Sequence, residues 1–382
     1  MRSTLFLLFV ALLLGSAIAE KIVSCYVRPE IPPSPRVDPF LCTHLMLIGA
    51  ASLRDDGSAK LPDAALLRPI VALKKQNERL RIFVTLLPEN RVMSALVTSP
   101  NLTEAFVRDV TAFMLDGNVD GFDIDWEFPV WSDDAKPSDR KGFSTLLRSL
   151  RSAFDVTPRR LGLSLAVSAP FTITKKAYDV AIIDELPCAD FVQIMNYDFH
   201  FFAKHTPFTG LNAPLFALKY EFFILKKLNS AYSTLFWLSQ GLSADKLVFG
   251  IPTYGRGFRL LSDDLHFPYS PATGVSDLFG DFVSFPQVCT ALNSSSFVAE
   301  WNEHAKSPYF HGRKQWVSFE NVRSVAAKAA HAKKLGIRGI MIFDLANDDF
   351  DGSCGLGGAY PLIRTAKEAF IGSHNSCKFC LN

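Results

Sequence analysis

The sequence lacks the features that mark nucleic-acid-binding proteins, disordered chains and modular arrays. It has no block of basic residues, because its 40 lysines and arginines are interspersed with 38 aspartates and glutamates, for a formal net charge of +2. Nucleic acid is therefore not expected as a partner. It also has no internal repeat, no low-complexity linker and no cysteine-rich binding module. Because 48% of its residues are hydrophobic, the chain can bury a large core.

Long hydrophobic runs are missing after the N-terminus. Arg2 precedes an apolar run from Leu5 to Leu14, which is shorter than the about 20 residues that cross a bilayer. Ala17-Ile18-Ala19 then supplies the small residues that a signal peptidase recognises. We predict that residues 1–19 are a signal peptide and that residues 20–382 are secreted to the extracellular space. A membrane anchor is the alternative interpretation. We expect the mature chain to be a monomer without a membrane partner.

Secretion makes disulfides the expected state of most cysteines. Their number is odd, so at least one has no partner within the chain. The seven cysteines are Cys25, Cys42, Cys188, Cys289, Cys354, Cys377 and Cys380. Asn101 and Asn293 each begin an Asn-X-Ser/Thr triplet and are N-glycosylation acceptors if the chain passes through a eukaryotic secretory pathway.

Eight short runs rich in apolar and β-branched residues recur along the chain, mostly separated by stretches with helical periodicity. This alternation implies a parallel sheet. In several runs both the odd and the even positions are apolar, as expected for strands buried between a barrel interior and an outer ring of helices. The pattern predicts an α/β fold, a closed (β/α)8 TIM barrel. The eight predicted strands are Ile22 to Val27, Thr43 to Gly49, Leu80 to Leu86, Gly121 to Asp125, Gly162 to Ser168, Phe191 to Tyr197, Leu247 to Thr253 and Gly339 to Asp344.

Between these strands, helices are predicted over Ala64 to Glu78, Thr103 to Leu115, Gly142 to Phe154 and Asn321 to Leu335. The interval from Phe258 to Gln315, between the seventh and eighth strands, is too long for one helix. It is rich in aromatic, Pro, Gly and Ser residues, and we predict an inserted subdomain there. Insertions after a barrel strand emerge on the face that carries the active site, so this one should form a wall of the cleft.

The most informative segment is the fourth predicted strand and its exit. Because strand side chains alternate, Asp123, Asp125 and Glu127 share one face. The other face carries Phe122, Ile124 and Trp126, which must meet the helices. The three acids therefore point into the barrel, with Glu127 at the rim. Burying them costs several kcal/mol unless protons are shared or partners supplied, which predicts a functional site. A solvated edge strand and a metal site for a hard cation are the alternatives; we expect neither a metal nor a cofactor.

Asp120 to Glu127 resembles the DxxDxDxE signature of glycoside hydrolase family 18, the chitinases and chitinase-like lectins. The resemblance spans the mature chain in strand order, including the position of the insertion. The further matching segments are Gln193 to Asp198, Thr209 to Leu215, Gly250 to Phe258, Trp316 to Val322 and Asp348 to Gly352.

The resemblance implies retaining hydrolysis of β-1,4-linked N-acetylglucosamine, in which the 2-acetamido oxygen of the substrate is the nucleophile. Glu127 would protonate the leaving oxygen and then activate water, which requires a raised pKa. Asp125 would hold the acetamido N–H, Asp123 would share a proton with Asp125, and Tyr197 would donate to the acetamido group. The expected partner is chitin or another glycan that contains N-acetylglucosamine.

The resemblance also implies a set of substrate-binding residues and two disulfides. The binding residues are Tyr26, Trp126, Met195, Asp198, Tyr254, Arg256 and Phe343. The disulfides would join Cys25 to Cys42 and Cys289 to Cys354, whereas Cys188, Cys377 and Cys380 are left unassigned.

The sequence departs from the family pattern where sugars usually stack. The third predicted strand lacks Ser-x-Gly-Gly, Phe343 replaces a tryptophan, and Phe199 to Phe202 lacks the usual Gly and Trp. Phenylalanine offers a smaller π-face than tryptophan. Two alternatives therefore stay open: a non-hydrolytic chitin-binding lectin, and an endo-β-N-acetylglucosaminidase acting on N-glycans.

Overall fold

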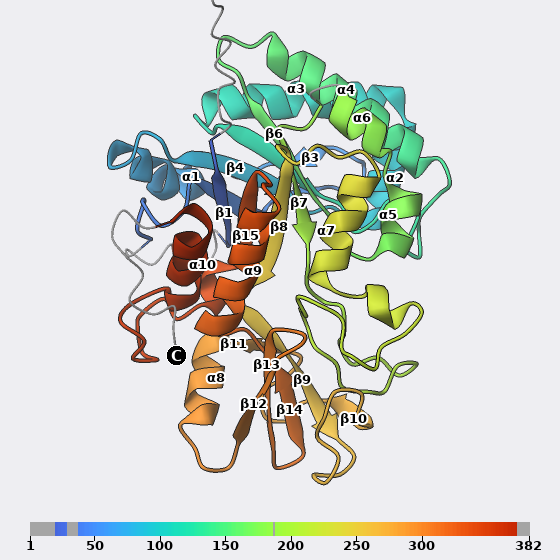
Figure 1. The fold of residues 1–382 in the computed structure, drawn as a ribbon. Helices are drawn as coiled ribbons and strands as arrows, with labels where there is room; N and C mark the ends of the chain where they lie inside the picture. The colour runs from blue at the N-terminus through green and yellow to red at the C-terminus, as the bar shows by residue number, and fades with distance from the viewer. Residues whose placement is uncertain (1–19, 29–36, 186–187, 373–382) are drawn as a thin grey trace, which may run out of the picture.

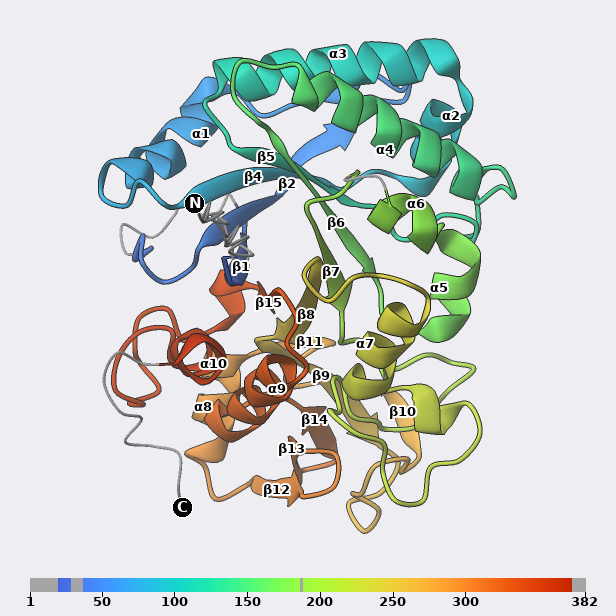
Figure 2. The ribbon, with the colours of Figure 1, turned by 45° about the horizontal axis from the view of Figure 1, so that its top comes forward.

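Eight parallel strands close into a barrel in the computed structural model, which describes residues 20–28, 37–185 and 188–372 (Figures 1 and 2). The strand order is β1-β15-β8-β7-β6-β5-β4-β2, and pairing of β1 with β2 closes the ring. The predicted (β/α)8 fold is confirmed. The barrel strands are β1 Ile22–Val27, β2 His44–Leu53, β4 Arg81–Leu86, β5 Gly121–Asp125, β6 Gly162–Ser168, β7 Phe191–Met195, β8 Leu247–Pro252 and β15 Gly339–Phe343. A short β3, Ala59–Lys60, pairs antiparallel with the end of β2.

Each barrel strand is buried on both faces because alternate side chains pack into two different hydrophobic cores. In β1, Ile22 and Tyr26 join a cluster inside the barrel. Val23, Cys25 and Val27 join the larger cluster between the barrel and its helices. Two-sided burial explains why the strands show as nearly continuous apolar runs in the sequence.

The helices pack around the outside of the barrel, as Figure 2 shows for α3 and α4. Pro69 lies within α1, which passes at Ala72 into a 3-10 helix, so the predicted helix over Ala64 to Glu78 is split in two. Within the described ranges, no helix is long and apolar enough to span a membrane. The helices are α1 Ala64–Val71, α2 Asn90–Thr98, α3 Pro100–Asp116, α4 Asp139–Asp155, α5 Phe171–Ala177, α6 Val180–Glu185, α7 Ser230–Ser239, α8 Phe285–Leu292, α9 Val322–Lys334 and α10 Pro361–Ile371, with 3-10 helices η1 Ala72–Lys75, η2 Leu225–Lys227 and η3 Leu345–Asn347.

A second, antiparallel sheet lies between β8 and β15, at the bottom of Figure 1. Its order is β10-β9-β14-β13-β12, β11 pairs with β9, and α8 follows β11. Its own core includes Phe258, Trp316 and Tyr309. The sheet extends over Tyr254 to Ser318 and so contains the insertion predicted for Phe258 to Gln315. The strands are β9 Tyr254–Leu260, β10 Ala272–Val275, β11 Phe282–Ser284, β12 Val298–Asn302, β13 Ser307–Gly312 and β14 Gln315–Ser318.

A second long excursion, over residues 196–229, follows β7 and was not singled out from the sequence. Its regular structure is limited to isolated bridges and η2. It is fastened to the second sheet, since the Thr209 amide donates to the Ser270 carbonyl at 2.9 Å and the Ala272 amide to the Pro207 carbonyl at 2.9 Å. The barrel therefore carries two insertions that are joined to each other, rather than one.

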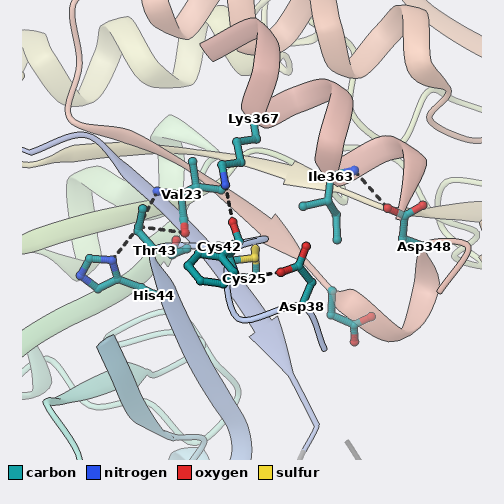
Figure 3. Close-up of a disulfide and its surroundings, with 12 residues drawn as sticks. Val23, Cys25, Asp38, Cys42, Thr43, His44, Asp348, Ile363 and Lys367 are labelled. Carbon is teal, nitrogen blue, oxygen red and sulfur yellow. Dashed lines mark hydrogen bonds between the residues drawn. A yellow bond between two sulfur atoms is a disulfide. The ribbon is translucent and has the colours of Figure 1, made fainter. Parts of the chain in front are cut away.

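Both predicted disulfides are present. Cys25 of β1 is bonded to Cys42, just before β2, and Cys289 of α8 is bonded to Cys354, which follows β15. Figure 3 shows the first of them, with Thr43 accepting from the Val23 amide at 2.9 Å beside it. Cys188 is buried and has no disulfide partner among the described residues. Residues 1–19, Cys377 and Cys380 lie outside the described residues.

Removing the first disulfide should destabilise the barrel at its point of closure. The Cys25→Ala/Cys42→Ala variant opens a link with a sequence separation of 17. Cross-linking a loop of this size lowers the entropy of the unfolded chain enough to stabilise the folded state by about 3 kcal/mol. We expect a loss of that order in the free energy of unfolding, measured by guanidinium titration. Overlapping unfolding curves for parent and variant would contradict it.

Candidate active site

The inner face of β5 carries the three acids, as the alternation predicted. Asp123 and Asp125 are fully buried inside the barrel, and Glu127 follows at the rim, where its side chain is exposed. Trp126 faces the opposite way. Its indole N–H donates to Asn90 Oδ1 at 2.8 Å and its ring packs edge-on against Phe143 at 5.6 Å, in the layer between barrel and helices. This placement corrects the expectation that Trp126 binds substrate.

Asp123 is held by four donors from four other strands. Ser164 Oγ lies at 2.6 Å, Tyr26 Oη at 2.8 Å, Thr85 Oγ1 at 3.1 Å and Gln193 Nε2 at 3.3 Å. Burial raises the pKa of Asp123, while these hydrogen bonds oppose the rise. Both carboxyl oxygens already accept two bonds, so the predicted sharing of a proton with Asp125 is not a direct hydrogen bond in this structure.

Asp125, unlike Asp123, is not surrounded by hydrogen-bond donors from the described part of the chain. Its Oδ1 is buried without a hydrogen-bond partner among the described residues. Burial first, and then the negative charges of Glu127 and Asp123, raise its pKa well above the usual value. A raised pKa favours the protonated form of Asp125, and its Oδ1 is available to a polar ligand group such as an amide N–H.

Glu127 combines access to solvent with a raised pKa. Desolvation by the surrounding protein is the main cause, and the charge of Asp198 adds to it. A carboxyl group that keeps its proton to higher pH, at an accessible position, is suited to general acid catalysis.

Aromatic side chains line the barrel mouth beside these acids. Among the described residues, the buried Tyr197 hydroxyl has only a weak contact, to Met341 Sδ at 3.8 Å, so it remains able to donate to a ligand. The Phe343 ring lies 5.7 Å from the Tyr197 ring and 5.5 Å from the Tyr26 ring. Met195 belongs to the same cluster inside the barrel. The structure thus brings these predicted residues together.

An ion-pair group stands where the barrel meets the second sheet. Asp198 accepts from the Tyr254 hydroxyl at 2.7 Å and from Arg256 Nε at 2.8 Å, and its second oxygen pairs with Arg256 Nη2 at 2.7 Å. Arg256 also pairs with Asp281, and its guanidinium lies 3.8 Å from the centroid of the Phe282 ring. Asp198, Tyr254 and Arg256 were predicted, whereas Asp281 and Phe282 were not.

Four further residues of the site were missed from the sequence: Ser24, Thr85, Ser164 and Gln193. Each is a polar residue buried in an otherwise apolar strand. Ser24 extends the network by donating to Gln193 Oε1 at 2.5 Å. In the sequence, each of them could be found as a polar residue at a strand position whose side chain points into the barrel. Within the described ranges, no group of three or more His, Cys, Asp or Glu side chains is arranged to hold a metal ion.

Comparison with known proteins agrees with this geometry. The model of the family described as Glycosyl hydrolases family 18 matches residues 22–348. Chitotriosidase-1 of Mus musculus is 32% identical over 344 residues, covering 87% of this chain and 72% of that protein. The oviduct-specific glycoprotein of Mus musculus is 30% identical over 354 residues, covering 88% of this chain but only 47% of its own length.

Solved structures are similar over their whole length. The Group IV chitinase of Ostrinia furnacalis superposes with a TM-score of 0.85 at 32% identity, covering 92% of this chain and 100% of that one. Human YKL-39, described as a pseudo-chitinase with retained chitooligosaccharide binding properties, superposes with a TM-score of 0.82 at 27% identity, covering 91% and 99%. With the carboxylate face of β5 and the family match over residues 22–348, these similarities show that the chain belongs to family 18 of the glycosyl hydrolases, the family of the chitinases and chitinase-like proteins.

Proposed function

We propose that this chain is a secreted, retaining hydrolase of β-1,4-linked N-acetylglucosamine in chitin or chitooligosaccharides. The observation that carries the proposal is the pairing of an accessible Glu127 of raised pKa with a buried Asp125 whose pKa is also raised and whose Oδ1 has no hydrogen-bond partner among the described residues. Two neighbouring carboxyls in contrasting environments are a common basis for dividing acid, base and stabilising roles.

In the proposed mechanism, Glu127 gives its proton to the glycosidic oxygen as the bond to the anomeric carbon breaks. The substrate's acetamido oxygen attacks the same carbon from the opposite side and forms an oxazolinium ion. Asp125 holds the acetamido N–H, and the Tyr197 hydroxyl, which lacks a strong partner of its own, donates to the acetamido oxygen. Ionised Glu127 then takes a proton from water, which attacks and restores the original configuration.

A non-hydrolytic lectin is the second candidate. The pseudo-chitinase among the similar structures and the loss of usual stacking residues favour it. The presence of Glu127 favours hydrolysis, because a lectin has no use for a proton donor at this position. Cleavage of the N-glycan core would use the same carboxyl groups in a cleft of different shape.

The deciding experiment incubates the purified protein with chitooligosaccharides and, separately, with an N-glycosylated protein. Mass analysis of the products identifies the bond that is cut, and proton NMR of the first products gives the anomer. β-Anomers from chitooligosaccharides support the proposal. Binding without products supports the lectin, and release of N-glycans supports the endoglycosidase.

The proposal includes export through a secretory pathway. It rests on the leader predicted at residues 1–19 and on Asn101 and Asn293, which are both exposed and accessible for glycans. N-terminal sequencing of protein recovered from the medium tests it, since a first residue of Glu20 is expected.

Asp198→Asn should move the alkaline limb of the pH profile to lower pH. The general acid must be protonated, so kcat/KM falls as pH rises through the pKa of Glu127. Asp198 contributes to raising that pKa, and its neutralisation lowers it. Asp281→Asn is the matched control, because Asp281 also pairs with Arg256 but does not raise the pKa of Glu127. An alkaline limb that is the same in Asp198→Asn and the parent would contradict this assignment.

A further inference from the structure

A cavity of about 480 Å³ lies outside the candidate active site, between two loops. One is the segment 218–228, here called the aromatic loop, and the other is the segment 261–270 between β9 and β10. Apolar side chains provide most of the lining, including Tyr220, Phe222 and Leu225 from the first loop and Phe267 and Pro268 from the second. Figure 1 shows both loops on the flank below α7 and beside β10. The proposed hydrolysis makes no use of this cavity.

Beside the cavity, the aromatic loop presents a protruding apolar tip. Phe223 is 84% exposed, and Ile224 next to it is also exposed. Phe223 has a φ of 48°, a left-handed conformation that a bulky residue adopts only at an energetic cost. Its ring packs edge-on against Phe222 at 5.5 Å but does not line the cavity. Strain and exposure at one large apolar residue indicate that the tip is kept for a contact with another molecule.

Hydrogen bonds and a cation–π contact hold the loop that carries the tip in place. Glu221 Oε2 accepts from the Leu218 amide at 2.8 Å, and its other oxygen accepts from the Tyr269 hydroxyl of the facing loop. Asn229 Nδ2 donates to the Lys226 carbonyl at 3.0 Å. The ammonium group of Lys227 lies 4.8 Å from the centroid of the Phe171 ring. A contact made by this loop would therefore lose little conformational entropy.

The flank carries a protruding tip, a cavity and exposed charges of both signs, which a two-fold dimer can pair. The tip and the cavity lie side by side on one loop, so a two-fold axis can place the tip of each copy over the cavity of the other. The aromatic loop exposes Lys219 and Lys226, whereas the facing loop exposes Asp263 and Asp264. The same axis can bring cations of one copy to anions of the other. The two aspartates make an anionic lipid surface a poorer match.

We propose that this flank binds a second copy of the chain in a two-fold dimer, in place of the monomer expected from the sequence, with Phe223 of each copy seated in the cavity of its partner. The proposal is independent of catalysis. It would give the protein two clefts, and so two points of attachment to one polymer.

The test is sedimentation equilibrium of the full mature chain over a range of concentrations, with Phe223→Gly as the first variant. Glycine suits the φ of 48°, so the loop should keep its form and the protein its stability. We expect a reversible dimer for the parent and a dimer dissociation constant at least 10-fold higher for the variant, as for a residue central to an interface. Val156→Ser, at a residue that is also 84% exposed, is the control and should leave the dimer intact.

A charge exchange tests the two-fold arrangement. Lys226→Asp and Asp264→Lys should each weaken the dimer, and the double variant should recover it. A parent that stays monomeric, a Phe223→Gly variant that dimerises like the parent, or a double variant that does not recover would overturn the proposal. Binding of a monomeric parent to phosphatidylserine vesicles that is lost in Phe223→Gly would also overturn it and assign the tip to a lipid surface.

Discussion

Glu127→Gln is expected to lower kcat on chitooligosaccharides by at least 10²- to 10⁴-fold, the usual contribution of a general acid, while the dissociation constant changes little. Glutamine keeps the size and the hydrogen-bonding capacity of the protonated acid but has no proton to transfer. The raised pKa of Glu127 favours the protonated acid, which the amide resembles in shape, so the fold and the bound state should be preserved.

An activated aryl glycoside is the internal control for this variant. Its leaving group departs without a proton, so the first step should lose much less rate than on the natural oligosaccharide. Calorimetric titration with a chitooligosaccharide checks that binding survives. If Glu127→Gln hydrolyses chitooligosaccharides as fast as the parent, Glu127 is not the acid. If the parent itself binds but is inert, the lectin is the correct alternative.

The barrel was predictable because its signal is local. Three predicted strands, Ile22 to Val27, Gly121 to Asp125 and Gly162 to Ser168, have the same bounds as β1, β5 and β6. Burial on both faces forces a continuous apolar run, which then stops at polar or glycine-rich exits. The second strand was predicted to end at Gly49, but β2 continues to Leu53 because its end pairs with β3. An antiparallel pairing at the end of a strand, such as that of β2 with β3, leaves no pattern in the apolar run of that strand alone.

The acids of β5 were predictable for the same reason, since period two places them on one face. Their partners were not. Thr85, Ser164 and Gln193 come from strands far apart in the sequence, and each is one polar residue among apolar neighbours. Only closure of the barrel brings them to Asp123. The excursion over residues 196–229 was missed because it has little periodic structure and depends on contacts with the second sheet.

These long-range contacts decide which acid does what. Asp123 receives four donors, whereas Asp125, two residues along the same strand, has an oxygen with none among the described residues. The same burial therefore leaves one carboxyl satisfied and the other available to substrate. Strand periodicity places the three acids on one face, and the contacts made on barrel closure give each of them a different environment.

Asp125→Asn is expected to lower kcat by about 10²- to 10³-fold, the range found when one stabilising group is removed from developing charge. Asparagine has nearly the same size and shape as aspartate, so packing should survive.

The free energy of unfolding as a function of pH provides the check. Because burial raises the pKa of Asp125, the parent should lose stability as pH rises from the ordinary aspartate pKa towards the folded-state value. The variant should lack that loss and unfold no more easily than the parent at neutral pH.

The aryl glycoside then separates the two roles. Asp125 acts on the acetamido group and the positive charge of the intermediate, which form whatever the leaving group is, so Asp125→Asn should be slow on aryl glycoside and oligosaccharide alike. On the aryl glycoside, Glu127→Gln should release the aryl group quickly in the first turnover and then turn over slowly, because its hydrolytic step still lacks the base. On the oligosaccharide both steps should be slow. Pre-steady-state and steady-state kinetics of both variants on both substrates give the comparison. If Asp125→Asn recovers on the activated substrate as Glu127→Gln does, Asp125 serves proton delivery, and the unpartnered oxygen at the centre of the barrel does not hold the acetamido group.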